Sequence, residues 1–475
     1  MSIDYSGLNS KISAQGVIIS ITSNHPLVKL GKSIPWDELS KTILPDLQAT
    51  TKKKSWWLGR PLSLRIHLGA YLLQQIFNKT DRQTEYDLKD NGAYQLFCGK
   101  ELVKKWHCPD HTKIEEFRSR LSPNTQRQLA NKIAKIAVKL GFADPAQFDI
   151  DSTIQEANMA YPSDSNLLCK LGILAKKAAD YLNEKIYCFK HKAMMVDLKK
   201  IKSYARRYFF LKKTASIEEK NSKLRALLNC VYDETKLIIS NCRCMGEYFI
   251  NEMPINIKRN FLQLIEKATK YLQDVKTFLD TGVMVADKIL SFHLEKVCCF
   301  IKNKAGKKYQ FGRTFQLARI KGNFLFVGEC DIPNLPDKKS ISLMLKAHTE
   351  TFGKVKIKSV ATDKGYYSKK NEKILHSHKV SEIGIQRPNN IKKASINRLS
   401  SSRTEELVNR RAGIEPLIGH TKHKGQLGRS RMKSDITNYA SGYSAILGFN
   451  LRQMIRHKIG KFKEIERLKK IKEVA

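Results

Sequence analysis

The order of strand-like and helix-like segments constrains the fold of this chain more than any other feature of its sequence. Phe148 and Ile150 alternate with Asp149 and Asp151, which is the pattern of a half-buried strand, and the residues up to 160 fit a turn followed by a second strand. Strand patterns return only after residue 295, because residues 165–295 are helix-like and dense in Lys and Arg. A sheet built from segments this far apart requires the helical stretch to be an insert. We therefore expect an α/β layer interrupted by a helical excursion.

The segments after the insert alternate between strands and helices. The strand-like ones are KKYQFGRTFQLARI, NFLFVGECDI, KVKIKSVATD and VSEIGIQRP. Helix-like segments separate and follow them, and the chain ends in a charged tail. The resulting division is an irregular N-terminal arm over 1–33, an all-α N-terminal domain over 34–147, an α/β core over 148–164 and 296–434, the helical insert over 165–295, and C-terminal helices with a basic tail over 435–475.

The N-terminal domain has the pattern of a short array of basic helices. RPLSLRIHLGAYLLQQIF has largely helical apolar spacing, Thr80 is a good cap for the next helix, and SPNTQRQLANKIAKIAVKLGF ends at Gly141. Such an array fits a helix-turn-helix reader of DNA, and it fits a packing or dimerisation domain equally well. The turn boundaries alone do not identify a recognition helix.

The charge balance indicates a polyanionic partner. The 475 residues contain 86 Lys and Arg against 45 Asp and Glu, for a formal net charge of +41. Nucleic acid best explains so one-sided a balance; a ribosomal protein, a membrane-surface protein and a merely solubilising surface are the alternatives. The N-terminus lacks a signal-peptide pattern, no apolar run approaches about 18 residues, and the ten cysteines show no zinc-finger spacing. We therefore expect a cytosolic protein with reduced thiols.

Two acidic residues follow apolar strand segments directly, where an acid is costly unless it has a function. Asp151 ends the first strand pattern, and Asp363 ends KVKIKSVATD. Magnesium-dependent phosphoryl transfer on nucleic acid uses two or three such carboxylates to hold two ions about 3.5–4 Å apart. We expect Gly365 to permit a tight turn after Asp363, and Tyr366 and Tyr367 to pack or to contact a phosphate.

A third acid, Glu415, has informative spacing. Arg411, Glu415, Ile418 and Lys422 are separated by four, three and four residues, which places them on one face of a helix. An acid flanked by two cations fits a metal ligand beside a phosphate track. Taken alone, the spacing is better explained by an ordinary surface salt bridge between Arg411 and Glu415. Pro416 lies within this segment, and a proline inside a helix bends it. The four residues therefore share a face only if the bend is mild.

Three blocks, FDIDST, ATDKGYYS and RRAGIEPLIGHTKHKGQLGRSRM, resemble the signature blocks of bacterial DDE insertion-sequence transposases. The most similar group is the one named after insertion sequence five. GRPLSLRIHLGAYLLQQIF, TDRQTEYDLKDNGAYQLFCG and PDHTKIEEFRSRL resemble the N-terminal domain of that group, and SGYSAILGFNLRQMI resembles its C-terminal helix. The resemblance covers most of residues 55–160 and 300–458, and its specificity comes from three ordered blocks together with the N-terminal domain.

The resemblance implies a function and a site. It implies an RNase H-like core in a transposase that binds the terminal repeats of its insertion sequence, cuts at the ends and joins the 3′-OH to target DNA. It also implies a homodimer in a synaptic complex, in the bacterial cytoplasm with the nucleoid. The catalytic and metal-binding triad is then Asp151, Asp363 and Glu415, which hold two Mg²⁺ ions that Mn²⁺ can replace. The expected DNA contacts are Arg411, His420, Lys422, Lys424, Arg429 and Arg431.

Some features depart from the family pattern or offer alternatives. In related transposases a tyrosine often lies seven residues before the glutamate, and here that position is Val408. The insert is also longer than expected for the group, and the resemblance assigns it no role. Asp149 shares a strand face with Asp151, and the family match prefers Asp151. The histidines of HSH at 376–378 and HTKH at 420–423 suggest a metal site or a single-strand nuclease, but no partnered tyrosine supports it. The alternative to an active enzyme is a catalytically silent, transposase-derived DNA-binding protein.

One segment of the insert, KKIKSYARRYFFLKK, interleaves aromatic residues with seven cations. One interpretation is an amphipathic helix with its aromatic residues inward and its cations in solvent. The other is a DNA-facing lid that clamps a transposon end or the end held by a partner subunit.

Overall fold

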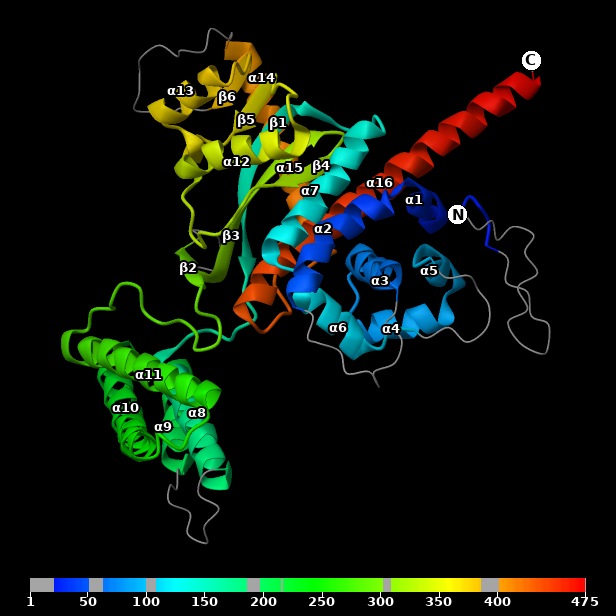
Figure 1. The fold of residues 1–475 in the computed structure, drawn as a ribbon. Coiled ribbons are helices and arrows are strands. Elements are labelled where there is room, and N and C mark those ends of the chain that lie inside the picture. Colours follow the sequence, from blue (N-terminus) through cyan, green and yellow to red (C-terminus); the bar gives the residue numbers. More distant parts are fainter. Residues whose placement is uncertain are drawn as a thin grey trace, which may run out of the picture. The chain divides into compact units, whose positions relative to one another are not determined.

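Two compact units make up the chain. The computed structural model describes residues 21–50, 63–99, 108–185, 197–214, 217–301, 309–385 and 401–474. Residues 1–158 with 298–475 form the first unit, and residues 159–297 form the second (Figure 1). The second unit therefore has nearly the bounds of the insert that the sequence predicted, 165–295. Within the described ranges, no helix has the length and apolar character that a membrane crossing needs.

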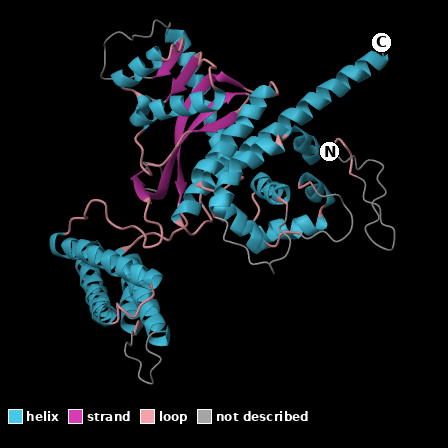
Figure 2. Cartoon of the chain, in the orientation of Figure 1, coloured by secondary structure: helices cyan, strands magenta, loops and turns pink. Residues whose placement is uncertain are grey.

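The first unit is organised around one mixed sheet, drawn in magenta in Figure 2. The strand order is β2-β3-β1-β5-β6, and β4 also pairs with β3. β3 runs antiparallel to β1 and to β4, whereas β5 runs parallel to β1 and β6 runs parallel to β5. The bounds are β1 (Asp144–Glu156), β2 (Cys298–Ile301), β3 (Tyr309–Lys321), β4 (Phe324–Val327), β5 (Ser359–Thr362) and β6 (Glu382–Ile385).

β1 shows the alternation that its sequence predicts. Phe148 and Ile150 are fully buried, and the ring of Phe148 packs against the rings of Phe326 and His348. Asp149 and Asp151 point to the opposite side, because successive side chains of a strand alternate between its faces. The predicted strand is therefore confirmed, and both aspartates lie on one face of the sheet. Its predicted end is wrong, because β1 stays paired with β3 as far as Glu156, so Asp151 lies inside the strand and no second strand follows it there.

Helices α1 to α7 precede β1 along the chain. The cap predicted at Thr80 is confirmed, because Thr80 Oγ1 accepts a hydrogen bond from the Gln83 amide (3.3 Å) and Gln83 Oε1 accepts one from the Thr80 amide (3.0 Å). Gly141 follows α7 with a φ of 71°, a left-handed conformation that favours glycine. The bounds are α1 (Pro26–Ser33), α2 (Trp36–Ala49), α3 (Leu64–Phe77), α4 (Asp81–Asp90), α5 (Gly92–Phe97), α6 (His111–Arg120) and α7 (Pro123–Lys139).

α1 corrects the prediction of an irregular arm over 1–33. His25 Nδ1 accepts a hydrogen bond from the Leu27 amide (3.2 Å), and Pro26 suits the first turn of a helix, where its missing N–H is not needed. Leu27 and Leu30 are buried in the main core. Tertiary packing thus stabilises a helix too short to show a long periodic pattern in the sequence.

The N-terminal helices, the sheet and the C-terminal helix α16 (Asp435–Val474) share one hydrophobic core. Asn450 of α16 accepts a hydrogen bond from the Leu325 amide (2.9 Å) and donates one to the Leu325 carbonyl (2.7 Å). Asn131 of α7 makes the same pair of bonds to Val327 (3.0 and 2.9 Å). Two buried amides therefore satisfy the free backbone edge of β4, and segments that the sequence analysis assigned to separate domains form one unit.

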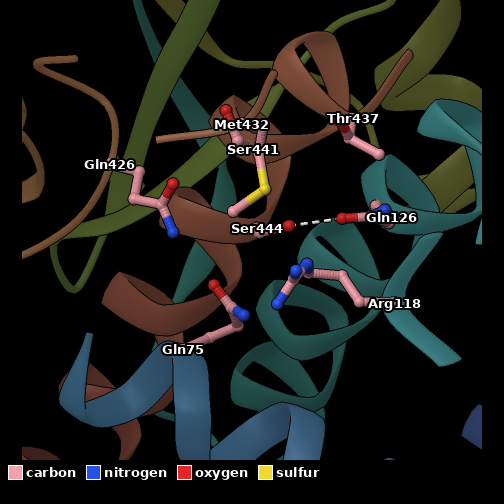
Figure 3. Close-up of a pocket in the computed structure, with 8 residues that line it drawn as sticks. All are labelled: Gln75, Arg118, Gln126, Gln426, Met432, Thr437, Ser441 and Ser444. Atoms are coloured by element: carbon pink, nitrogen blue, oxygen red, sulfur yellow. Dashed lines mark hydrogen bonds between the residues drawn. The ribbon is translucent and has the colours of Figure 1, made fainter. Parts of the chain in front are cut away.

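A small polar pocket lies between the N-terminal helices and α16 (Figure 3). Its volume is about 10 Å³, room for one water molecule at most. Ser444 donates a hydrogen bond to Gln126, and the Tyr71 hydroxyl lies 2.9 Å from both Gln126 Oε1 and Ser444 Oγ. The pocket is lined by Gln75, Arg118, Gln126, Gln426, Met432, Thr437, Ser441 and Ser444.

Four helices and a short turn complete the first unit. α14 packs against β5, β6 and β1, whereas α12 packs against β3 and the turn η1. The bounds are α12 (Asp337–Phe352), the 3-10 turn η1 (Lys364–Tyr366), α13 (Lys369–Ser377), α14 (Ser401–Ala412) and α15 (Ile414–His423).

The second unit is helical in its described part and has a hydrophobic core of its own (Figure 2). Asp164, at the start of α8, binds Lys288 Nζ (2.5 Å) and the Tyr271 hydroxyl (2.8 Å). Because Lys288 follows the last helix, this cluster ties the beginning of the unit to its end. The bounds are α8 (Asp164–Lys185), α9 (Lys199–Thr214), α10 (Ile217–Tyr248) and α11 (Ile255–Thr281).

Candidate active site

Asp151 and Asp363 come from neighbouring parallel strands. β1 and β5 pair Asp149 with Ala361, and two residues further along each segment are Asp151 and Asp363. The register therefore places the two acids at the same level of the sheet, where adjacent strands are about 4.8 Å apart. Asp363 is exposed and caps η1, its Oδ1 accepting a hydrogen bond from the Lys364 amide (2.7 Å).

Arg411 joins Asp151 to Glu415. Its Nη2 donates to Asp151 Oδ2 at 2.8 Å, and its Nη1 donates to Glu415 Oε1 at 3.2 Å. The side chains of Asp151 and Arg411 are 14% and 16% exposed, whereas that of Glu415 is 62% exposed. The bond to Glu415 is the surface pair that the spacing alone favoured. The bond to Asp151 crosses 260 residues of chain, and it brings the third predicted acid to the first.

Asp149, two residues before Asp151, is the centre of a buried ion cluster that we call the Asp149 anchor: Asp149, Arg319 and Arg410. Asp149 Oδ1 accepts hydrogen bonds from Arg410 Nε (3.0 Å) and Nη2 (2.5 Å). Its Oδ2 accepts from Arg319 Nη2 (3.2 Å), which also donates to the Arg410 carbonyl (2.9 Å). Asp149 is completely buried, so the anchor holds the end of α14 against β1.

The anchor positions the candidate site. Because Arg410 and Arg411 are consecutive, gripping Arg410 at Asp149 fixes where Arg411 meets Asp151. A Cβ on Gly413 would lie 1.9 Å from Arg319 Nη1, so any larger residue there would displace this guanidinium from its present position. Sequence analysis missed Arg319 and Arg410. The only sequence signals were two acids on one strand face and two adjacent arginines in RRAG.

The carboxyl group of Asp151 is in an unfavourable place for a charge. Burial raises its pKa above the ordinary value, and the Arg411 guanidinium and the Ser152 amide oppose this effect only in part. The nearby negative charge of Asp363 raises the pKa slightly further. Tyr366 is buried, and its hydroxyl donates to Gln316 (2.9 Å), so this tyrosine packs rather than facing solvent.

The helix expected to carry Arg411, Glu415 and Lys422 is broken. α14 ends at Ala412 and α15 begins at Ile414, so the two cations lie on different helices. Pro416 falls in the first turn of α15, where its missing N–H has no helical partner, so the helix tolerates it. Gly365 does not have a left-handed φ, so the turn after Asp363 does not need glycine.

The other expected DNA contacts lie in α15 and the loop after it. His420, Lys424, Arg429 and Arg431 are exposed, and Lys422 is half-buried. The loop is tied to the end of β1, because the Glu156 amide donates to the Gly428 carbonyl (3.0 Å) and the Ser430 amide donates to the Glu156 carbonyl (2.9 Å). The strand that bears Asp151 therefore also holds the exposed cations.

The predicted triad has the right donor atoms for a hard cation, but it does not form a closed metal site. Carboxylate oxygens are the ligands that magnesium prefers. Among the described residues, no group of three or more His, Cys, Asp or Glu side chains is arranged to hold a metal ion, and Arg411 binds two of the three acids. His376 and His378 are exposed, and His378 Nδ1 lies 2.9 Å from the Ile374 carbonyl, so HSH offers no metal site in this region.

Comparison with known proteins finds a match to a transposase domain in the N-terminal part of the chain. Residues 18–120 match the family described as Transposase domain (DUF772). Over 154 residues the chain is 25% identical to the "Uncharacterized protein ORF8 in nfe locus" of Rhizobium meliloti, which covers 32% of this chain and 70% of that protein. No solved structure matches. The family match supports a transposase, a DNA-processing protein, and hence DNA as its partner.

Proposed function

We propose that this protein is a DDE transposase of the group named after insertion sequence five, with an RNase H-like core and the triad Asp151, Asp363 and Glu415. The observation that supports the proposal is that each of the other two acids is tied to Asp151 through the structure. Asp151 and Asp363 share a level of the sheet, and Arg411 joins Asp151 to Glu415. The sheet order β2-β3-β1-β5-β6 puts antiparallel strands on one side of β1 and parallel strands on the other, and β1 carries Asp151. This arrangement supports an RNase H-like core.

Magnesium is the cofactor of this proposal, held by Asp151, Asp363 and Glu415, with manganese as a substitute. Bound ions would stabilise the charge that develops on the reacting phosphate. Glu415 is largely exposed, so exchanging its bond to Arg411 for a cation costs little packing. Arg411 then presents a planar fork of donors, which suits a phosphate. The Asp149 anchor keeps this guanidinium at the site.

The proposed reaction has two steps. Water breaks a phosphodiester bond at the transposon end and leaves a 3′-OH and a 5′-phosphate. The 3′-OH then attacks a phosphate of the target DNA in line, forms a new phosphodiester bond and displaces the 3′-oxygen of the target strand. No covalent bond to the protein forms, so catalysis comes from positioning and charge stabilisation. Because two ends must be joined together, two protomers meet in a synaptic complex.

Cleavage of the element's own terminal repeats by the full-length chain, with Mg²⁺ or Mn²⁺, tests the proposal. Asp363→Asn is expected to abolish cleavage and to leave end binding largely intact. Asp287→Asn is the matched control, because Asp287 is exposed in the second unit and has a φ of 54°, which asparagine tolerates.

Two results would contradict the proposal in different ways. An Asp363→Asn protein that cuts at nearly the wild-type rate removes Asp363 from the triad. A wild-type protein that binds the ends but does not cut with either metal is the catalytically silent DNA-binding protein that we give as the alternative.

A further inference from the structure

Helix α9 of the second unit exposes aromatic side chains on its outer face, outside the hydrophobic core of the unit. Its inner face is formed by Ile201, Tyr204, Ala205 and Tyr208, which pack in the core of the unit at helical spacing. The prediction of an amphipathic helix with inward aromatic residues therefore holds for the two tyrosines. It fails for the two phenylalanines that follow, because Phe209 and Phe210 are 51% and 58% exposed.

The exposed rings lie among cations. Phe209 and Phe210 contact each other edge to face, with ring centroids 6.0 Å apart. Arg206 lies one helical turn before both rings, and Arg207 lies one turn before Phe210, and both arginines are exposed. Nearer the start of the helix, Lys199, Lys200 and Lys202 are also exposed, and α9 contains no acidic residue. Glu234 of α10 binds one of these lysines, Lys200, at 3.5 Å.

We propose that this α9 platform, defined as Lys199, Lys202, Arg206, Arg207, Phe209 and Phe210, binds single-stranded DNA. Unpaired bases stack on the two phenyl rings while the cations contact the phosphates on either side. The inference rests on the nucleic-acid partner proposed above, but it does not require the triad or any cleavage step.

The chemistry of the platform selects a single strand over a duplex. Phenylalanine has no donor or acceptor with which to read base edges, and the bases of a duplex already stack on one another. An unpaired base offers a ring face, and every base has one, so exposed aromatic rings beside cations form a binding surface with little sequence preference. A membrane surface fits less well, because interfacial helices carry their apolar and cationic residues on opposite faces.

The test compares the affinity of the full-length protein for labelled oligothymidine of about 16 nucleotides with its affinity for a duplex of equal length. Each stacked ring is expected to contribute about 5-fold or more, so Phe209→Ala with Phe210→Ala should weaken single-strand binding about 30-fold. Duplex binding should change by less than about 2-fold by the same reasoning. Replacing Arg206 and Arg207 with Gln should lower the log–log salt slope by roughly 0.7 for each lost phosphate contact.

Matched variants separate stacking from other effects. Tyr248→Ala is the control for an exposed aromatic residue of the same unit, since Tyr248 is 80% exposed at the end of α10, and it should leave single-strand affinity unchanged. Phe209→Trp with Phe210→Trp should preserve binding, whereas Phe209→Leu with Phe210→Leu should not, because leucine keeps apolar area without a ring. An unchanged circular dichroism spectrum shows that each variant folds.

The inference is overturned if the double alanine variant binds oligothymidine as the wild type does, or if leucine restores binding fully. It is also overturned if the variant loses binding to phosphatidylserine vesicles and keeps its single-strand affinity, which would identify a lipid surface. Failure of the wild type to cut terminal repeats would contradict the proposed transposase activity and leave this outcome unaffected.

Discussion

Asp149 and Asp151 lie two residues apart on one strand face, each bound to one of two adjacent arginines, and we expect replacing them to affect stability differently. The buried carboxylate of Asp149 accepts four hydrogen bonds. Asp149→Asn replaces one of its oxygens with an amide nitrogen, which cannot accept a hydrogen bond. Removing one partner of a buried ion pair costs about 3–5 kcal/mol. Arg319 and Arg410 are 13% and 22% exposed, so water relieves part of their charge, and we expect a loss near the lower end, about 3 kcal/mol.

Asp151→Asn is expected to leave the free energy of unfolding unchanged or to raise it. Burial raises the pKa of Asp151 despite its bond to Arg411, which means that folding disfavours its charged form. A neutral amide of the same shape removes that cost. A variant that is as stable as the wild type but cannot cut DNA would support the role proposed for Asp151 in the triad.

Urea unfolding, followed by tryptophan fluorescence and by circular dichroism, measures both effects, and agreement of the two probes tests for a single transition. Arg403→Gln is a control on the same helix, since Arg403 binds Glu382 at the surface and its loss should shift the midpoint far less than Asp149→Asn does. The reasoning is refuted if the two aspartate variants are equally destabilised, or if Asp149→Asn unfolds at the wild-type urea concentration.

Three further predictions concern other parts of the first unit. Hydrogen bonds from Lys89 and His111 lower the pKa of Glu85 to about 2, so its contribution to stability is present above its ordinary value of 4.5 and is lost as the pH falls toward 2; the difference in unfolding free energy between wild type and Glu85→Gln should close over this range. Lys422→Ala should weaken DNA binding about equally for all sequences and reduce the salt slope by roughly 0.9, as measured by titrations of cognate and unrelated duplexes; a sequence-selective loss would assign Lys422 another role. Gly413→Ala should displace the Arg319 guanidinium and lower the thermal midpoint, whereas Gly419→Ala, at a position with open space around it, should not.

Local patterns determined much of the architecture. Alternating side chains identify β1, an apolar run that ends in an acid identifies β5 and Asp363, and a capping pair identifies the start of α4. The long helical stretch between strand patterns identifies the insert. These features follow from the sequence because strand alternation, helical spacing and capping depend on residues within one or two turns of each other. The same locality made the acids Asp151 and Asp363 visible as candidates.

Only the tertiary structure decided which residues of the site act together. Asp149 and Asp151 are the same residue type on the same face of one strand. They differ because the end of α14, some 260 residues later in the chain, buries Asp149 through Arg410 and contacts Asp151 only through Arg411. The break at Gly413, the joining of the N-terminal helices to β4 by Asn131 and Asn450, and the outward rings of α9 have the same origin. Each depends on what packs against a segment, and periodicity within a segment carries no information about a neighbour that is distant in the chain.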